Sequence, residues 1–178
     1  VEKFLQTDAD YLVVLEDDLR IDNNFSSTLQ EILHYLHSQK NIEWSLINIA
    51  AKKNKISREI FRTHDYSLVR AYYFPIRGVG LVWSRQGAHD FLKMAQNPCL
   101  PVDIFFQNWL IKNGKGLSIW PPLVRPAGLD SDILGTVATE RVKRKQKENR
   151  DFSFFMKKQL RLLKNNILAY INFLSFKS

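Results

Sequence analysis

The chain has 178 residues, 45% of them apolar and 25% charged, which is enough for one domain with a hydrophobic core but too few for two domains. Its single cysteine, Cys99, excludes an internal disulfide and a thiolate metal cluster, and fits a reducing compartment. The net charge of +8 arises in residues 140–178, which hold 11 Lys or Arg against 3 Asp or Glu. We therefore expect the neutral body and the basic tail to meet different partners.

The first half of the chain predicts two strands and a helix. The apolar run Tyr11–Leu15 predicts a strand buried on both faces, and three acids follow it directly. A helix capped by Asn24 or Ser26 is predicted from apolar residues at helical spacing: Leu29, Ile32, Leu33 and Leu36. The segment Trp44–Ala50 predicts a second strand, and the polar, basic segment Lys52–Asp65 predicts a surface loop.

The second half predicts further strands alternating with helices. Ser84 is suited to cap one helix, and Pro101 to begin another that ends at Asn113-Gly114. Three apolar runs predict strands: Leu68–Tyr73, Val79–Trp83 and Leu117–Trp120. This alternation predicts an α/β layered domain with a mixed, mainly parallel sheet.

A basic amphipathic helix is predicted for residues 151–178, after a charged linker at 136–150. Apolar residues trace one face of it: Met156, Leu160, Leu163, Ile167, Tyr170 or Ile171, and Leu174. Lys157, Arg161 and Lys164 lie on a neighbouring face. This pattern favours binding of residues 141–178 to an anionic membrane surface. The alternative is that the stripe packs on the rest of the chain or on a second subunit. We expect no membrane span, and no nucleic-acid partner, because no nucleic-acid-binding module is visible and the body is neutral.

The acids Glu16, Asp17 and Asp18 form the strongest candidate site. Ligands of α/β sheets bind in the crevice beyond the carboxyl ends of the strands. Negative charge gathered there favours a cation, and carboxylates suit Mg²⁺ or Mn²⁺ that also binds substrate phosphates. On an extended segment Glu16 and Asp18 point to one side and Asp17 to the other. The alternative is a solvated acidic turn.

Several blocks of the sequence, in order over residues 1–135, resemble glycosyltransferase family 25, which includes bacterial lipopolysaccharide and lipooligosaccharide galactosyltransferase-like enzymes and their collagen-modifying relatives. The blocks are Tyr11-Leu12-Val13-Val14-Leu15-Glu16-Asp17-Asp18, Gly80-Leu81-Val82-Trp83-Ser84-Arg85-Gln86-Gly87-Ala88, Pro101-Val102-Asp103, Pro121-Pro122-Leu123-Val124 and Ser131-Asp132-Ile133. One position departs from the family pattern, since Leu81 stands where the family has tyrosine.

The resemblance implies a GT-A-like fold, a UDP-sugar donor with UDP-galactose as the default, a divalent cation and inversion at the anomeric carbon. It implies that Asp18 and Glu16 hold Mn²⁺ or Mg²⁺ and that Glu16 and Asp17 also contact the donor. Asp103 is the candidate general base; its alternative role is a first-turn acid that the helix dipole favours.

Three more residues are donor-site candidates through the resemblance: Ser84, Arg85 and Asp132. Ser84 is alternatively an N-cap, and Arg85 is suited to a diphosphate or carboxylate partner. Asp130 and Asp132 are suited to a further metal contact or to hydroxyls of the donor sugar, and their alternative is a solvated loop.

The resemblance thus implies a hexosyltransferase that adds galactose to a lipid-linked oligosaccharide in lipopolysaccharide or lipooligosaccharide biosynthesis. The basic tail fits a cytoplasmic protein, peripheral on the inner face of the bacterial inner membrane. Because the chain begins at Val1 and reaches a strand at Tyr11, we expect a fragment that lacks its N-terminal part and transfers little sugar by itself. The rival interpretation is a non-catalytic remnant that acts as a membrane-surface or interaction protein.

Overall fold

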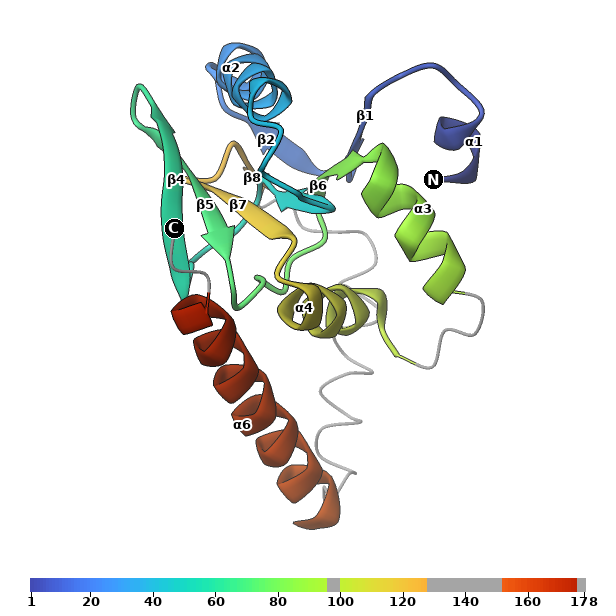
Figure 1. Cartoon of the computed structure of the whole chain (residues 1–178), viewed down its shortest axis with the longest axis vertical. Helices are drawn as coiled ribbons and strands as arrows, with labels where there is room; N and C mark the ends of the chain where they lie inside the picture. The colour runs from blue at the N-terminus through green and yellow to red at the C-terminus, as the bar shows by residue number, and fades with distance from the viewer. Residues whose placement is uncertain (96–99, 128–151, 176–178) are drawn as a thin grey trace.

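The computed structural model describes residues 1–95, 100–127 and 152–175, and Figure 1 shows how its elements are arranged. The helices are α1 (Glu2–Leu5), α2 (Phe25–Ser38), α3 (Arg85–Met94), α4 (Val102–Asn113) and α6 (Phe152–Ser175). The strands are β1 (Tyr11–Leu15), β2 (Leu19–Ile21), β3 (Leu46–Asn48), β4 (Ser57–Thr63), β5 (Tyr66–Ala71), β6 (Gly80–Ser84), β7 (Gly116–Trp120) and β8 (Val124–Pro126). Six strands form one sheet in the order β1-β6-β3-β7-β5-β4, and β2 pairs with β8 in a second, small sheet.

The large sheet separates two apolar cores. Ile47 of β3 and Val82 of β6 belong to the core that α2 covers, together with Ile32. Their neighbours Leu46 and Trp83 belong to the opposite core, which α1, α3 and α4 cover. This alternation follows from the period of two in a strand, and it gives three layers, helix, sheet and helix. Burying each such aliphatic side chain fully stabilises the fold by about 1.5–3 kcal/mol.

The α/β architecture is confirmed, but the sheet is mostly antiparallel, so the expectation of a mainly parallel sheet needs correction. Among the described pairings of the large sheet, only β3 with β7 is parallel. A parallel pair needs a long crossover connection, and α3 and α4 lie on the one that joins β3 to β7. Between β3 and β6 the described chain contains no helix. It contains β4 and β5, which pair with each other as an antiparallel hairpin.

Two strands differ from the sequence prediction at the edges of the sheet. β4 lies within the segment Lys52–Asp65, which was predicted to be a loop, because an edge strand needs no apolar pattern to pair. β1 is the other edge and is not buried on both faces: Val13, Val14 and Leu15 are 38%, 40% and 36% exposed. The described residues pair β1 on one side only, with β6.

The start of α3 is fixed by a predicted cap and by a close backbone contact. The Ser84 hydroxyl oxygen accepts a hydrogen bond of 3.0 Å from Gly87 N and donates one of 2.8 Å to Trp44 O. A Cβ atom on Gly87 would lie 2.1 Å from Ser45 O, which is a backbone atom ahead of β3. Gly87 therefore permits the first turn of α3 to lie directly against that backbone.

Replacing Gly87 with alanine should lower stability, although the same change in an open helix raises it by about 0.5–1 kcal/mol. The added methyl group meets a carbonyl rather than a flexible side chain, so we expect a loss of about 1–3 kcal/mol. Urea unfolding of the Gly87→Ala variant measures this loss in the free energy of unfolding. The control is Gln86→Ala, because Gln86 is exposed on the same turn of the helix. A Gly87→Ala variant as stable as the parent would contradict the contact.

Candidate active site

The candidate site lies at one edge of the large sheet, where three strands end. β1 and β3 are both antiparallel to β6, and β7 is parallel to β3, so β1, β3 and β7 run in the same direction. Their carboxyl ends therefore meet at one edge, although the sheet as a whole is mostly antiparallel. The segments that follow these three strands begin with Glu16, Ile49 and Pro121.

The acidic cluster Glu16–Asp18 occupies the connection between β1 and β2, where the chain passes from the large sheet to the small one. The backbone bends at Asp17 and Asp18, so the alternation expected of an extended segment does not apply there. Glu16 N donates a 3.0 Å hydrogen bond to Val79 O, which fixes the start of this connection against the loop before β6. All three side chains are exposed.

The acids influence one another. Partial burial raises the pKa of Glu16, and the negative charges of Asp18, Asp103 and Asp17 raise it further, in that order. Asp18 thus acts on Glu16 more strongly than Asp17 does. Among the described residues, no salt bridge involves any of these acids. The cluster therefore holds negative charge that the described part of the chain does not neutralise.

Asp103 approaches this cluster from a different element. It lies in the first turn of α4, which Pro101 precedes as N-cap residue. A Cβ atom on Gly78 would lie 2.6 Å from Asp103 Oδ1, so glycine at this position leaves room for the carboxylate beside the loop backbone. The negative charge of Asp103 is among the causes that raise the pKa of Glu16, after burial and Asp18, so the two carboxyl groups are near enough to interact. The structure therefore brings together the predicted metal ligands and the predicted base.

These residues fit a metal ion that a substrate helps to bind. In the residues that the structure describes, no three His, Cys, Asp or Glu side chains are grouped so that they could hold a metal ion by themselves. Mg²⁺ characteristically takes one or two carboxylates, several waters and substrate phosphates, and a full set of protein ligands is not required. Glu16 and Asp18 are two carboxylates at the sheet edge whose charge is not neutralised, so they suit a cation that waters and a substrate phosphate also bind.

A residue that sequence reasoning did not single out, Asn48, positions the loop of the site. Its side chain is fully buried at the end of β3. Its Nδ2 donates a 2.7 Å hydrogen bond to Arg77 O, and its Oδ1 accepts one of 2.9 Å from Ala50 N. The sequence did hold a signal for this role, because Asn48 is a polar residue within the apolar run Leu46–Ala50. A polar side chain buried in a strand needs specific hydrogen-bond partners.

The structure does not bring Ser84 and Arg85 to the acidic cluster. Ser84 pairs with Tyr11, five residues before Glu16 on β1, which corresponds to about 16 Å along a strand. The Arg85 guanidinium donates to three carbonyls, that of Leu5 at the end of α1 and those of Thr7 and Ala9 just after it, and lies over the Phe4 ring. Both residues thus stabilise the far end of β6. Asp130, Asp132 and the linker 136–150 lie outside the described residues.

Comparison with known proteins identifies the family. The model of glycosyltransferase family 25 (LPS biosynthesis protein) matches residues 2–106, more than half of the chain. The chain belongs to glycosyltransferase family 25. The matched region includes the acidic cluster and Asp103, so the site assembled above lies in the part of the chain that defines the family.

A relative supports the same assignment. Procollagen galactosyltransferase 1 from Danio rerio is 36% identical to this family 25 chain over 97 residues, which are 52% of this chain and 15% of the relative. The family 25 chain thus aligns with a small part of that much longer protein.

Proposed function

We propose that this family 25 protein is a metal-dependent, inverting hexosyltransferase that moves galactose from UDP-galactose to a glycan acceptor. The observation that supports this best is the meeting of Glu16 and Asp18 with Asp103 at one edge of the sheet. A transfer of this type needs negative ligands for a cation and a separate base for the acceptor. The two groups arise here from different elements, the β1–β2 connection and the start of α4.

Glu16 and Asp18 would hold Mn²⁺ or Mg²⁺, with Asp17 beside them toward the donor. The bound cation supplies neutralising charge for the departing diphosphate. The protein's own part is to keep these carboxylates at the sheet edge through the hydrogen bond from Glu16 N to Val79 O. Partial burial raises the pKa of Glu16 and repulsion from Asp18 raises it further; a bound cation would offset that repulsion.

Asp103 is the proposed general base. Its carboxylate accepts the proton of the acceptor hydroxyl as that oxygen forms a bond to the anomeric carbon and the bond from this carbon to the diphosphate oxygen breaks. Inversion requires the base and the leaving group on opposite sides of the sugar. Asp103 comes from α4 and the candidate metal ligands from the β1–β2 connection, so we propose that the base and the leaving group are held by different elements.

The proposals for the transferred sugar and for the pathway rest on the name of the relative and on the description of the family. The relative's name describes it as a galactosyltransferase that acts on procollagen, and the family description mentions LPS biosynthesis. We propose galactose as the transferred sugar, and lipid-linked oligosaccharide of lipopolysaccharide or lipooligosaccharide as the acceptor. The corresponding location is the cytoplasmic face of the bacterial inner membrane.

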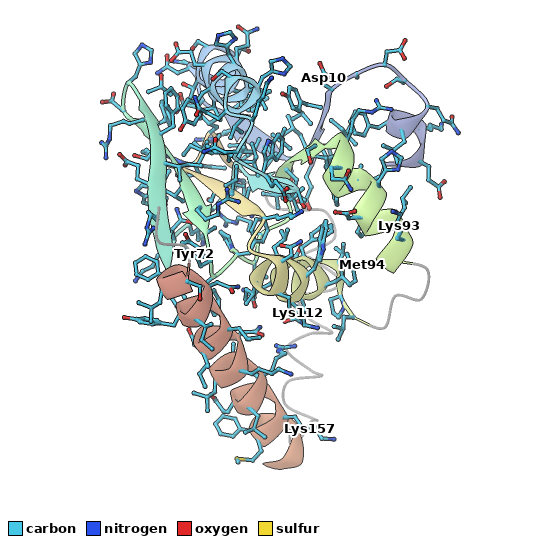
Figure 2. All side chains as sticks on the ribbon, viewed as in Figure 1. Asp10, Tyr72, Lys93, Met94, Lys112 and Lys157 are labelled. Atoms are coloured by element: carbon cyan, nitrogen blue, oxygen red, sulfur yellow. The ribbon has the colours of Figure 1, made fainter. Side chains whose placement is uncertain are left out.

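Substituting Asp18 should weaken metal-dependent donor binding, because one of the two proposed metal-ligating carboxylates is lost. Calorimetric titration of the protein with UDP-galactose and a panel of other UDP-sugars, with and without Mn²⁺, measures this for the parent and for Asp18→Ala. We expect at least about a tenfold loss of affinity. Asp10→Ala is the control, because Asp10 is exposed before the other end of β1, as Figure 2 shows. Metal-independent binding of every UDP-sugar to the parent would contradict the metal site.

Removing the charge of Asp103 should impair turnover but leave donor binding intact. For Asp103→Asn we expect kcat to fall by about 10²- to 10⁴-fold, the usual contribution of a general base. The dissociation constant for UDP-galactose with Mn²⁺ should stay within about twofold of the parent. A variant with full turnover would exclude Asp103 as the base, and a variant that loses donor binding would place Asp103 among the donor contacts instead.

The C-terminal helix α6 supports a peripheral membrane location. One face packs on the body through the buried Ala169 and Asn165, and Asn165 Nδ2 donates 2.9 Å to Asn108 Oδ1 on α4. A different face exposes the apolar stripe, which comprises Phe155, Met156, Leu160, Leu163, Ile167, Tyr170, Ile171 and Leu174. In the described part of the chain, no helix is long and apolar enough to cross a membrane.

The exposed stripe and the nearby cations match an anionic lipid surface. Lys157 and Lys164 lie beside this stripe on the same helix, and Figure 2 shows Lys157 at the end of α6 that extends away from the sheet. Apolar side chains enter the interface while each basic residue adds about 1 kcal/mol of attraction to anionic head groups. The described residues leave the stripe uncovered.

Vesicle co-sedimentation tests this surface. The parent should sediment with vesicles of anionic lipid and remain in solution with neutral lipid. A variant with Leu160→Gln, Leu163→Gln and Ile167→Gln should lose most of this binding while it keeps its fold, because these three side chains are exposed. Met94→Gln, at an exposed apolar residue on α3, is the control. Equal sedimentation of the stripe variant would contradict the proposal.

A further inference from the structure

A basic hollow lies at the same sheet edge as the acidic cluster. It has a volume of about 490 Å³. Its wall is formed by Lys52, Arg77, Arg125 and Trp120, together with three prolines. Lys52 and Trp120 come from the segments at the carboxyl ends of β3 and β7, the same edge at which Glu16 follows β1.

The hollow and the acidic cluster share one loop. Arg77 lines the hollow, Gly78 lies against Asp103, and Val79 O accepts the hydrogen bond from Glu16 N. On the other side, Asp18 O accepts a 2.8 Å hydrogen bond from Ala127 N, directly after a proline that lines the hollow. A ligand in the hollow therefore lies next to the proposed reacting groups, with one loop between them.

The positive charges of this hollow have few partners inside the described structure. No salt bridge among the described residues involves Lys52, Arg77 or Arg125, and the Arg77 guanidinium donates a long hydrogen bond of 3.4 Å to Ala50 O. Arg125 pairs with Arg20 across β2 and β8, and Asp22 offsets part of this charge: the hydrogen bond from Asn24 N lowers the pKa of Asp22, and the charge of Arg125 lowers it further. Lys52 and Arg77 thus bring positive charge to the hollow that no described salt bridge neutralises, and an anion there would be attracted to it.

The hollow is also lined by an aromatic ring, that of Trp120. Trp120 ends β7 with 42% of its surface exposed, and prolines follow it. A large exposed aromatic ring beside charged groups is typical of a ligand site, in which an apolar face gives contact area and the charges give orientation. The apolar C–H face of a sugar ring suits the indole, and a negative substituent on that ring would reach the cations.

We propose that this hollow binds the acceptor through an acidic sugar, with the sugar ring against Trp120 and a carboxylate or phosphate group held by Lys52, Arg77 and Arg125. This proposal rests on the proposed transferase function and adds the chemical class of its acceptor. Guanidinium groups bind carboxylate and phosphate alike through paired N–H donors. An acceptor held in this way presents its remaining hydroxyls toward the Gly78 loop and Asp103.

Binding of simple sugars tests this hollow without any turnover. The probes are galacturonate, galactose 6-phosphate and neutral galactose, titrated into the whole protein and followed by NMR at constant ionic strength. We expect at least one anionic sugar to bind about tenfold or more tightly than galactose, the gain of one charge-assisted hydrogen bond. The carboxylate and phosphate probes identify which group is preferred. Equal binding of all three, or no binding of either anionic sugar, would overturn the proposal.

Two variants separate the hollow from the rest of the surface. Lys52→Gln combined with Arg125→Gln should weaken the anionic sugar about tenfold or more, and Trp120→Ala should weaken all three sugars. Lys53→Gln is the matched control, because Lys53 has the same charge one position along and does not line the hollow. Loss of binding in Lys53→Gln alone would show that general positive charge is responsible and overturn the proposal.

A separate experiment titrates UDP into the protein in the presence of Mn²⁺. Its affinity should be unchanged in the Lys52→Gln, Arg125→Gln variant, since the hollow serves the acceptor. A parallel loss of UDP would overturn the proposal and show that these cations hold the donor diphosphate. Failure of the transferase function itself would appear as metal-independent UDP-sugar binding in the Asp18 experiment, whatever the sugars do.

Discussion

The buried amide of Asn48 stabilises the loop on which the candidate site depends. Its 2.7 Å hydrogen bond to Arg77 O comes from a fully buried side chain and fixes a loop that contains no helix or strand. Three consecutive residues of that loop then serve different parts of the site: Arg77 lines the basic hollow, Gly78 makes room for Asp103, and Val79 O receives Glu16 N. Because a buried carbonyl or amide left without a partner costs about 1–3 kcal/mol, an apolar residue could not replace Asn48 there.

Strand direction, and not the type of pairing, determines where this site forms. The principle that ligands bind beyond the carboxyl ends of strands was derived for parallel sheets. In this family 25 chain most pairings are antiparallel, yet β1, β3 and β7 still share one direction because β6 lies antiparallel between β1 and β3. The acids, the Asn48 amide and Trp120 therefore reach the same edge. Helix α4, which leads into β7, begins near this edge and brings Asp103 to it.

The sequence predicted features that depend on neighbouring residues, such as helix caps, but it did not predict contacts between segments far apart in the chain. Ser84 as an N-cap and Gly114 as the left-handed residue after α4 need only neighbouring residues to act, and both are observed. β4 was missed because an edge strand with polar side chains shows no apolar alternation. Arg85 was expected to meet a diphosphate or a carboxylate, but only the folded chain brings the carbonyls of Leu5, Thr7 and Ala9 to its guanidinium. Resemblance identified Asp103, and folding alone places it beside Glu16.

Two regions of opposite charge lie side by side at this edge, and their separation has a chemical consequence. If Lys52, Arg77 and Arg125 formed salt bridges with Glu16–Asp18, both sets would be neutralised and neither would attract a ligand. The Arg77–Val79 loop lies between them, with its backbone bonded to Asn48 and Glu16, and keeps the two sets apart. The acids then remain available to a cation with its diphosphate, and the basic hollow to an anionic acceptor. Since the same loop borders both regions and Asp103, a shift of its backbone would alter the metal ligands, the base and the acceptor site together.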